Sequence, residues 1–277
     1  MKRIDWHAGF VSAMKLELVE NENDLTYDEE HPVANRAQRI DLLIIKNERS
    51  ARIINPIGAM FSKFNICEYK SPQHSLTYGD FYKVIAYTCL YLNETQHDTY
   101  HNAGDYTMTF VNESRPRKLF QQLHRDGIEI NETIPGIYRL SYDLPFKTQV
   151  IVTSELLPGR CSWLKCLTKK GTDCNLEYIV DATWNIRAHN KKYADNVMDV
   201  FTNANNTLVK RRKEEDPDMC NAVNELFADE IKELKSELND TKIELTDTKT
   251  KLSGALSQIA QLEKLLEEKA SASNNTN

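Results

Sequence analysis

Two short segments decide the fold: Arg-Ile-Asp-Leu-Leu-Ile-Ile-Lys at residues 39–46 and Phe-Asn-Ile-Cys-Glu-Tyr-Lys at residues 64–70. Both are rich in branched and aromatic residues, which predicts two β-strands, at residues 40–45 and 64–69. An acid interrupts each of them, Asp41 in the first and Glu68 in the second. A carboxylate in an apolar strand is costly to bury unless it is paired or coordinates a metal. The two acids therefore require partners.

Side chains two residues apart on a strand point to the same face of the sheet. Glu68 and Lys70 therefore project together, and Asp41 meets them if the two strands are neighbours. Two carboxylates and one cation at a single point suit Mg²⁺ and phosphate chemistry. The alternative interpretation is a structural ion pair between Asp41 and Lys70 at the sheet edge.

The set Asp41 and Glu68-Tyr69-Lys70 resembles the motif of the PD-(D/E)XK nuclease superfamily. The surrounding chain, roughly residues 1–150, is similar to the Rpn/YhgA-like, transposase-associated branch. Ile40 stands where the name-giving proline would be, which changes the strand entry rather than the chemistry. The Glu-X-Lys triplet alone has low specificity, because residues 230–232 and 233–235 also match it within a predicted helix. The strand context distinguishes Glu68 from those matches.

The resemblance implies a metal-dependent DNA endonuclease. Asp41 and Glu68 would hold Mg²⁺, for which Mn²⁺ can substitute, and the main-chain carbonyl of Tyr69 would be a further ligand. Lys70 would orient the attacking water or help to deprotonate it.

The resemblance also implies a glutamate on the first helix that assists the metal site, usually through water. We assign this role to Glu17, because it lies on the apolar stripe of the helix predicted over residues 3–22, with Phe10 and Met14. Glu20 shares a less apolar side of the same helix. The alternative is that Glu17 reaches solvent at the edge of the stripe.

Further candidates for contact with nucleic acid lie on two other predicted helices. Lys83 and Tyr87 occupy positions where related families often carry Gln and Tyr; alternatively they are a lysine extended along the surface and a core tyrosine. Arg115, Arg117 and Lys118 lie at the start of a helix predicted over residues 116–126, where main-chain amides would add donors for phosphate.

The order of predicted elements indicates an α/β to α+β fold, a restriction-endonuclease-like mixed sheet flanked by helices, within residues 1–155. A helix over residues 78–93 is apolar almost all round, and we expect it to be buried. The other strands are predicted at residues 25–35, 106–111, 128–130, 136–142 and 149–153. Residues 156–216 are predicted as a mainly helical extension.

A heptad pattern begins after a hinge at Asp216-Pro217 and predicts a coiled coil within residues 217–270, followed by a disordered tail at 271–277. Position a is filled by Ile231, Leu238, Leu245, Leu252, Ile259 and Leu266. Three Glu-to-Lys pairs at a spacing of five residues, beginning at Glu230, Glu237 and Glu244, favour a parallel neighbour. We therefore expect self-association through residues 224–266, as a parallel homodimer.

The net charge of −6 is unevenly spread. Residues 214–277 hold 15 acids and 7 bases, or −8, which leaves +2 for residues 1–213. That balance is compatible with a local basic face, although it lacks the strongly basic composition of a tight DNA binder.

The chain begins without an apolar signal region and has no run of the ~20 apolar residues that a membrane span needs. We expect a cytoplasmic protein with reduced cysteines and no membrane partner. The alternative function is a non-catalytic coiled-coil interaction protein that carries a degenerate nuclease-like domain.

Overall fold

The computed structural model describes residues 4–33, 39–48, 51–95, 101–143, 145–157, 159, 162–215, 238–239 and 241–256. The chain divides into two compact units, Met1–Asp216 and Pro217–Asn277. The boundary falls at the predicted hinge. Each unit is described by itself below.

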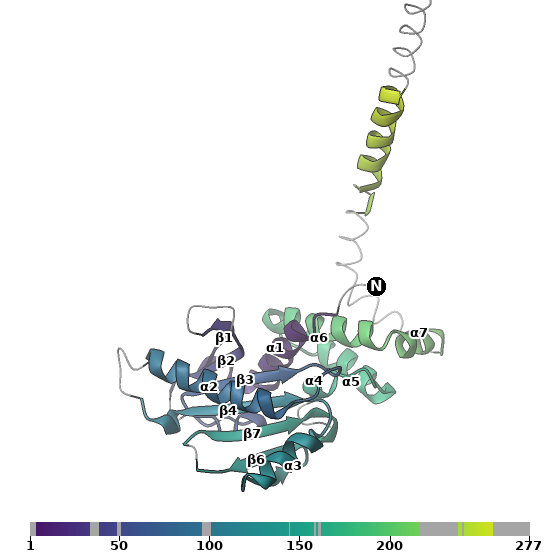
Figure 1. The fold of residues 1–277 in the computed structure, drawn as a ribbon. Coiled ribbons are helices and arrows are strands. Elements are labelled where there is room, and N and C mark those ends of the chain that lie inside the picture. Colours follow the sequence, from purple (N-terminus) through teal and green to yellow (C-terminus); the bar gives the residue numbers. More distant parts are fainter. Residues whose placement is uncertain are drawn as a thin grey trace, which may run out of the picture. The chain divides into compact units, whose positions relative to one another are not determined.

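The first unit is built on a seven-stranded mixed sheet in the order β1-β2-β3-β4-β7-β6-β5 (Figure 1). Its strands are β1 (Leu25–Pro32), β2 (Arg39–Lys46), β3 (Phe64–Lys70), β4 (Tyr106–Asn112), β5 (Glu129–Ile134), β6 (Ile137–Ser141) and β7 (Lys147–Val152). The pairs β3–β4 and β4–β7 are parallel, and the other pairs are antiparallel. This is an α/β architecture with a mixed central sheet, as the sequence predicts.

The two acid-bearing strands are neighbours, which confirms the adjacency on which the predicted site depends. In the antiparallel register of β2 and β3, Leu42 lies opposite Cys67. One residue further along, the same register sets Asp41 against Glu68. The start of β2 and the end of β3 therefore lie next to each other, at one end of these two strands.

Helices cover the sheet. The described α-helices are α1 (Trp6–Glu17), α2 (Tyr78–Thr95), α3 (Arg117–Arg125), α4 (Ser162–Lys165), α5 (Asp173–Trp184), α6 (Lys191–Ala204) and α7 (Asn206–Glu215). Short 3₁₀ turns are η1 (Val19–Asp24), η2 (Pro56–Gly58), η3 (Ala103–Asp105), η4 (Thr153–Glu155) and η5 (Ala188–Asn190). The connection between β2 and β3 contains η2.

Helix α2 is amphipathic. One side of it packs, together with α3, into a hydrophobic core cluster against the sheet. Phe81, Val84 and Tyr91 are buried in this cluster. Tyr82 and Leu90, by contrast, are 46% and 36% exposed. The prediction that α2 is buried all round is therefore wrong, because the helix packs on the sheet with one side and meets solvent with the other.

Residues 162–215 fold against α1 and belong to the same compact unit as the sheet. The amide of Asn196 on α6 donates to the Ser12 hydroxyl on α1 at 3.0 Å. Phe10 of α1 stacks on Tyr69 of β3, with 4.7 Å between the ring centroids. Figure 1 shows α1 beside α4 and α6. The helix α1 thus joins the carboxyl end of β3 to the C-terminal helices.

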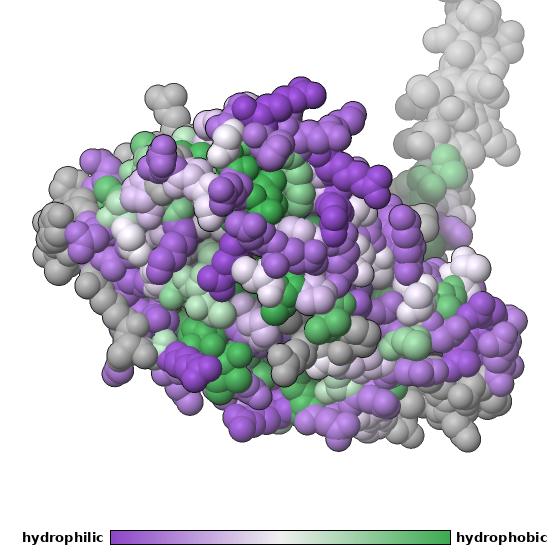
Figure 2. All heavy atoms as spheres, turned by 90° about the horizontal axis from the view of Figure 1, so that it is seen from below, coloured by the Kyte–Doolittle hydropathy of each residue, from purple (hydrophilic) through white to green (hydrophobic). Residues whose placement is uncertain are grey.

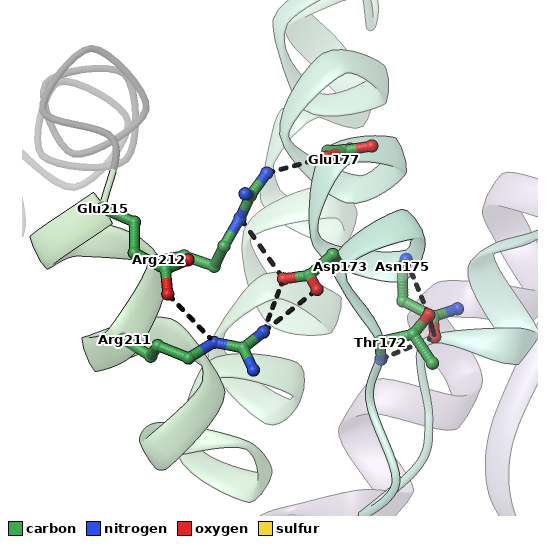
Figure 3. A network of polar contacts seen from close by, with 7 residues as sticks. All are labelled: Thr172, Asp173, Asn175, Glu177, Arg211, Arg212 and Glu215. Atoms are coloured by element: carbon green, nitrogen blue, oxygen red, sulfur yellow. Dashed lines mark hydrogen bonds and ion pairs between the residues drawn. The ribbon is translucent and has the colours of Figure 1, made fainter.

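A polar network fastens α7 to α5 (Figure 3). Arg211 Nη2 donates to both carboxylate oxygens of Asp173 at 3.0 Å, and Arg212 Nη2 donates to Glu177 at 2.8 Å. Thr172 caps the start of α5. The basic run at residues 210–213 thus has both of its arginines committed to ion pairs within the chain.

On the face drawn in Figure 2, hydrophilic residues surround small, separated hydrophobic patches. A search of the described residues finds no helix with the length and apolarity to cross a membrane. In the second unit, residues 241–256 are helical. Leu238, Leu245 and Leu252, three position-a leucines, are 54–59% exposed. The remainder of the predicted coiled coil, residues 217–237, 240 and 257–270, and the predicted disordered tail at 271–277 lie outside the described residues.

Candidate active site

The candidate site opens into a cleft of about 1280 Å³ at the carboxyl end of β3. Its wall combines the start of α1, the end of β3 with the loop that follows, and the junction of α6 and α7. The residues that line the cleft include His7, Asp41, Lys70, Asp80, Lys169 and Asn203. The carboxyl ends of strands in α/β sheets are a common place for ligands to bind.

Asp41 is the third residue of β2, and it lines the cleft. Its Oδ2 accepts the main-chain N–H of Tyr69 at 2.8 Å, which ties β2 to β3 at the site. Burial and the negative charge of Glu68 together raise the pKa of Asp41 to about 6, although the Tyr69 hydrogen bond acts in the opposite direction. The site therefore disfavours two uncompensated carboxylates.

Glu68 is 2% exposed and is not among the residues that line the cleft. Its Oε1 pairs with Lys83 Nζ on α2 at 2.5 Å and with Lys70 Nζ at 3.0 Å. The ammonium of Lys83 also lies 5.5 Å from the centre of the Tyr87 ring. The structure thus brings Lys83, predicted as a contact for nucleic acid, to the carboxylate of Glu68, and sets the buried ring of Tyr87 beside Lys83.

Lys70 bridges Glu68 and Asp80, whose Oδ1 lies 2.8 Å from Lys70 Nζ. Burial disfavours the charged ammonium, but the hydrogen bond to Asp80 and the charge of Glu68 outweigh it and raise the pKa of Lys70. The same pairing, with the Thr77 hydrogen bonds, lowers the pKa of Asp80 against the effect of burial. Lys70 is therefore a fixed cation at neutral pH.

Asp80 is a residue of the site that the sequence analysis does not include. Its Oδ2 accepts hydrogen bonds from the main-chain N–H and the hydroxyl of Thr77. Its Oδ1 remains directed at Lys70. A sequence signal for this contact does exist. The helix-capping motif Thr77-Tyr-Gly-Asp80 follows β3 in the chain, which places the first turn of α2 beside the end of that strand.

The donor set fits a divalent cation of the Mg²⁺ type. Within the described parts of the chain, Asp41 Oδ1 and Glu68 Oε2 take part in no hydrogen bond or ion pair. The same residues contain no group of three or more His, Cys, Asp or Glu side chains suited to hold a metal ion. Mg²⁺ is usually held by only one or two carboxylates and completes its shell with water and substrate phosphate. Two carboxylates with one open oxygen each meet that requirement.

The charges of the cluster also fit a cation. Asp41, Glu68 and Asp80 contribute three negative charges, against two positive charges from Lys70 and Lys83. His7 adds a favourable charge next to Asp41 when it is protonated. An additional cation would offset the remaining negative charge.

Glu17 is not brought to this cluster. Its Oε1 accepts the main-chain N–H of Leu164 at 3.0 Å, and Asn55 donates to its other oxygen at 3.3 Å. Burial raises the pKa of Glu17 to about 7, although these hydrogen bonds act in the opposite direction. His7, at the other end of α1, lines the cleft. Glu17 lies ten residues from it, about 15 Å along the helix axis, so the structure gives no support to the predicted role of Glu17.

The three basic residues at the start of α3 are divided in their contacts. Arg115 pairs with Glu155 at 3.0 Å and with the hydroxyl of Tyr138. Arg117 and Lys118 are exposed. The predicted phosphate contact at Arg115 would therefore compete with an existing ion pair.

Comparisons of this chain with protein-family models, with curated proteins and with solved structures found no match. The functional argument therefore rests on the geometry described above.

Proposed function

We propose that this protein is a metal-dependent phosphodiester hydrolase that cleaves DNA, with Asp41, Glu68 and Lys70 at its centre. The observation that carries the proposal is the meeting of two carboxylates from adjacent strands beside a fixed lysine at the end of β3. The resemblance of the motif to PD-(D/E)XK nucleases, and a mixed sheet compatible with a nuclease-like fold, add support.

In this proposal each residue has a role that follows from its position in the site. Asp41 and Glu68, with the carbonyl of Tyr69, would hold Mg²⁺, which when bound would polarise the phosphate and lower the pKa of a water. Lys70, as a persistent ammonium, orients that water and offsets charge on the phosphate; its raised pKa makes it a poor base. Asp80 fixes the position of the lysine.

Lys83 acts on the carboxylate rather than on the substrate in this proposal. Its ammonium occupies Oε1 of Glu68 and leaves Oε2 for the cation. Removal of Lys83 would leave Glu68, deep in the protein, with one cationic partner instead of two.

A second candidate is supported by the same contacts. Two lysines already neutralise Glu68, so the cluster is also consistent with a structural ion network in a non-catalytic protein. The exposed leucines of residues 238–252 would then serve the main role, which is interaction through the C-terminal helix.

Supercoiled plasmid incubated with the full chain distinguishes the two candidates. We expect nicked and linear products with Mg²⁺ or Mn²⁺ and none with EDTA. Lys70→Ala protein purified in parallel controls for contaminating nuclease. Equal cleavage by both proteins, or none by the wild type with either metal, would contradict the proposal.

A further inference from the structure

The cleft has a wall that the motif residues do not supply. Lys169 lies in the connection between α4 and α5, and Asn203 and Asn206 lie at the junction of α6 and α7. These residues are more than 90 positions from Lys70 in the sequence, yet they line the same cleft. Packing of α6 on α1 brings them there.

Lys169 differs in its contacts from the other lysine that lines the cleft. Lys70 is paired with Glu68 and Asp80. Lys169 is exposed and, within the described parts of the chain, forms no ion pair with a carboxylate. Its charge is therefore available to a ligand.

An anionic substrate requires positive charge in this cleft, and Lys169 can provide it. The acid-rich cluster around Asp41 repels a phosphate chain, and even a bound divalent cation attracts mainly the phosphate next to it. Neighbouring phosphates of a polynucleotide need separate cationic partners, since each phosphate carries its own charge. Lys169, on a separate segment of the wall, can provide one.

We propose that the helical segment 162–215 forms the substrate-binding wall of the active site, and that Lys169 binds a phosphate that flanks the scissile one. This inference rests on the proposed function and adds the residues that hold the substrate. Asn206 adds a polar side chain to the same wall, whereas the side-chain amide of Asn203 already donates to the main-chain carbonyl and the carboxylate of Asp199. The cleft volume of about 1280 Å³ exceeds the roughly 300–1,000 Å³ of typical small-molecule sites, as a polymeric substrate requires.

The test compares Lys169→Ala with Lys191→Ala in the full chain. Lys191 is exposed at the first position of α6. It is twelve residues from Asn203, about 18 Å along the helix. Affinity for a labelled duplex, too short to reach two copies of the cleft, is measured by fluorescence anisotropy with Ca²⁺ across a range of salt concentrations. Cleavage with Mg²⁺ is measured at saturating duplex.

We expect a severalfold loss of affinity for Lys169→Ala, together with a salt dependence shallower by about 0.9, the loss of one phosphate contact. Lys191→Ala should match the wild type in affinity, in salt dependence and in cleavage at saturating duplex. If the wild type binds and cleaves DNA while both variants match it, this inference fails alone. If the wild type neither binds nor cleaves, the proposed function fails with it.

Discussion

At the scale of single residues, the site depends on the balance of charge around Lys70. Two carboxylates hold its ammonium, at 2.8 Å and 3.0 Å, and they raise its pKa. A lysine with a raised pKa is a poor base at neutral pH, so in the proposed mechanism Lys70 contributes positive charge and orientation. This narrows the role expected from the sequence, which included help with deprotonation.

Lys70→Ala should abolish plasmid cleavage while metal binding persists, because the lysine acts on water and phosphate rather than as a ligand. Loss of its hydrogen bonds to charged partners should lower the free energy of unfolding by about 1–3 kcal/mol. Cleavage and urea unfolding are measured beside Lys63→Ala, a lysine that bonds a loop carbonyl at 3.1 Å. A Lys70→Ala protein that cleaves at the wild-type rate would rule out Glu68-Tyr69-Lys70 as the active strand.

At the scale of elements, the sequence predicts strands better than it predicts how helices are placed. The apolar runs of β2 and β3 are enough to predict both strands. Because consecutive strands often pair with each other, the sequence also predicts that Asp41 and Glu68 lie close together. Helical periodicity assigns Glu17 to the same face as Phe10 but does not say which end of the helix meets the cleft. Glu17 lies seven positions after Phe10, which is about 10 Å along the helix axis.

The contacts missed by sequence reasoning are those made over long distances in the chain. Lys169 reaches the cleft only because α6 packs on α1, and no local pattern around residue 169 reports that packing. The exposed side of α2 was missed for a related reason. Its apolar content does not reveal that only one layer covers it.

Glu17 should make stability depend on pH. Its pKa in the folded chain is about 7, against 4.5 for the ordinary group. The folded state therefore binds the proton more tightly, so the free energy of unfolding should fall as pH rises from about 4.5 to about 7, by about 3 kcal/mol at most.

Glu17→Gln removes this titration and should flatten the decline, whereas Glu20→Gln, at an exposed position four residues from Leu16, should keep the wild-type profile. Urea unfolding at several pH values measures the difference. Cleavage by Glu17→Gln should stay near the wild-type rate, because Glu17 contacts Asn55 and Leu164 rather than the cleft cluster. Parallel stability profiles for all three proteins would refute the account of Glu17.

At the scale of the whole molecule, the chain separates into a compact unit through Asp216 and a second unit after it. A chain that ends at Asp216 should fold with a single cooperative thermal transition, because its sheet and covering helices are complete. Calorimetry and expression in soluble form check this. An aggregated product, or a melt without cooperativity, would show that the tail is needed for folding.

The full chain should self-associate through residues 224–266. The leucines at positions 238, 245 and 252 are more than half exposed, and such a stripe is stabilised when a second helix covers it. Leu245→Lys should dissociate the assembly, while Thr250→Lys, at heptad position f on the outer side, should not. Sedimentation equilibrium provides the measurement; a wild-type species that stays at the monomer mass of 32.0 kDa at tens of micromolar would exclude self-association.

The central claim is that Asp41 and Glu68 form a divalent-cation site, and calorimetric titration with Mn²⁺ tests it most directly. The titration is made at about pH 7.5, above the raised pKa of Asp41 of about 6, so that the carboxylate is ionised. Asp41→Asn is the test variant, and Glu48→Gln is the control, an exposed acid seven residues along from Asp41 and about 23 Å away on an extended chain. We predict one binding event per chain for the wild type and Glu48→Gln, and none for Asp41→Asn; absence of binding to the wild type, or equal binding to all three proteins, would contradict the claim.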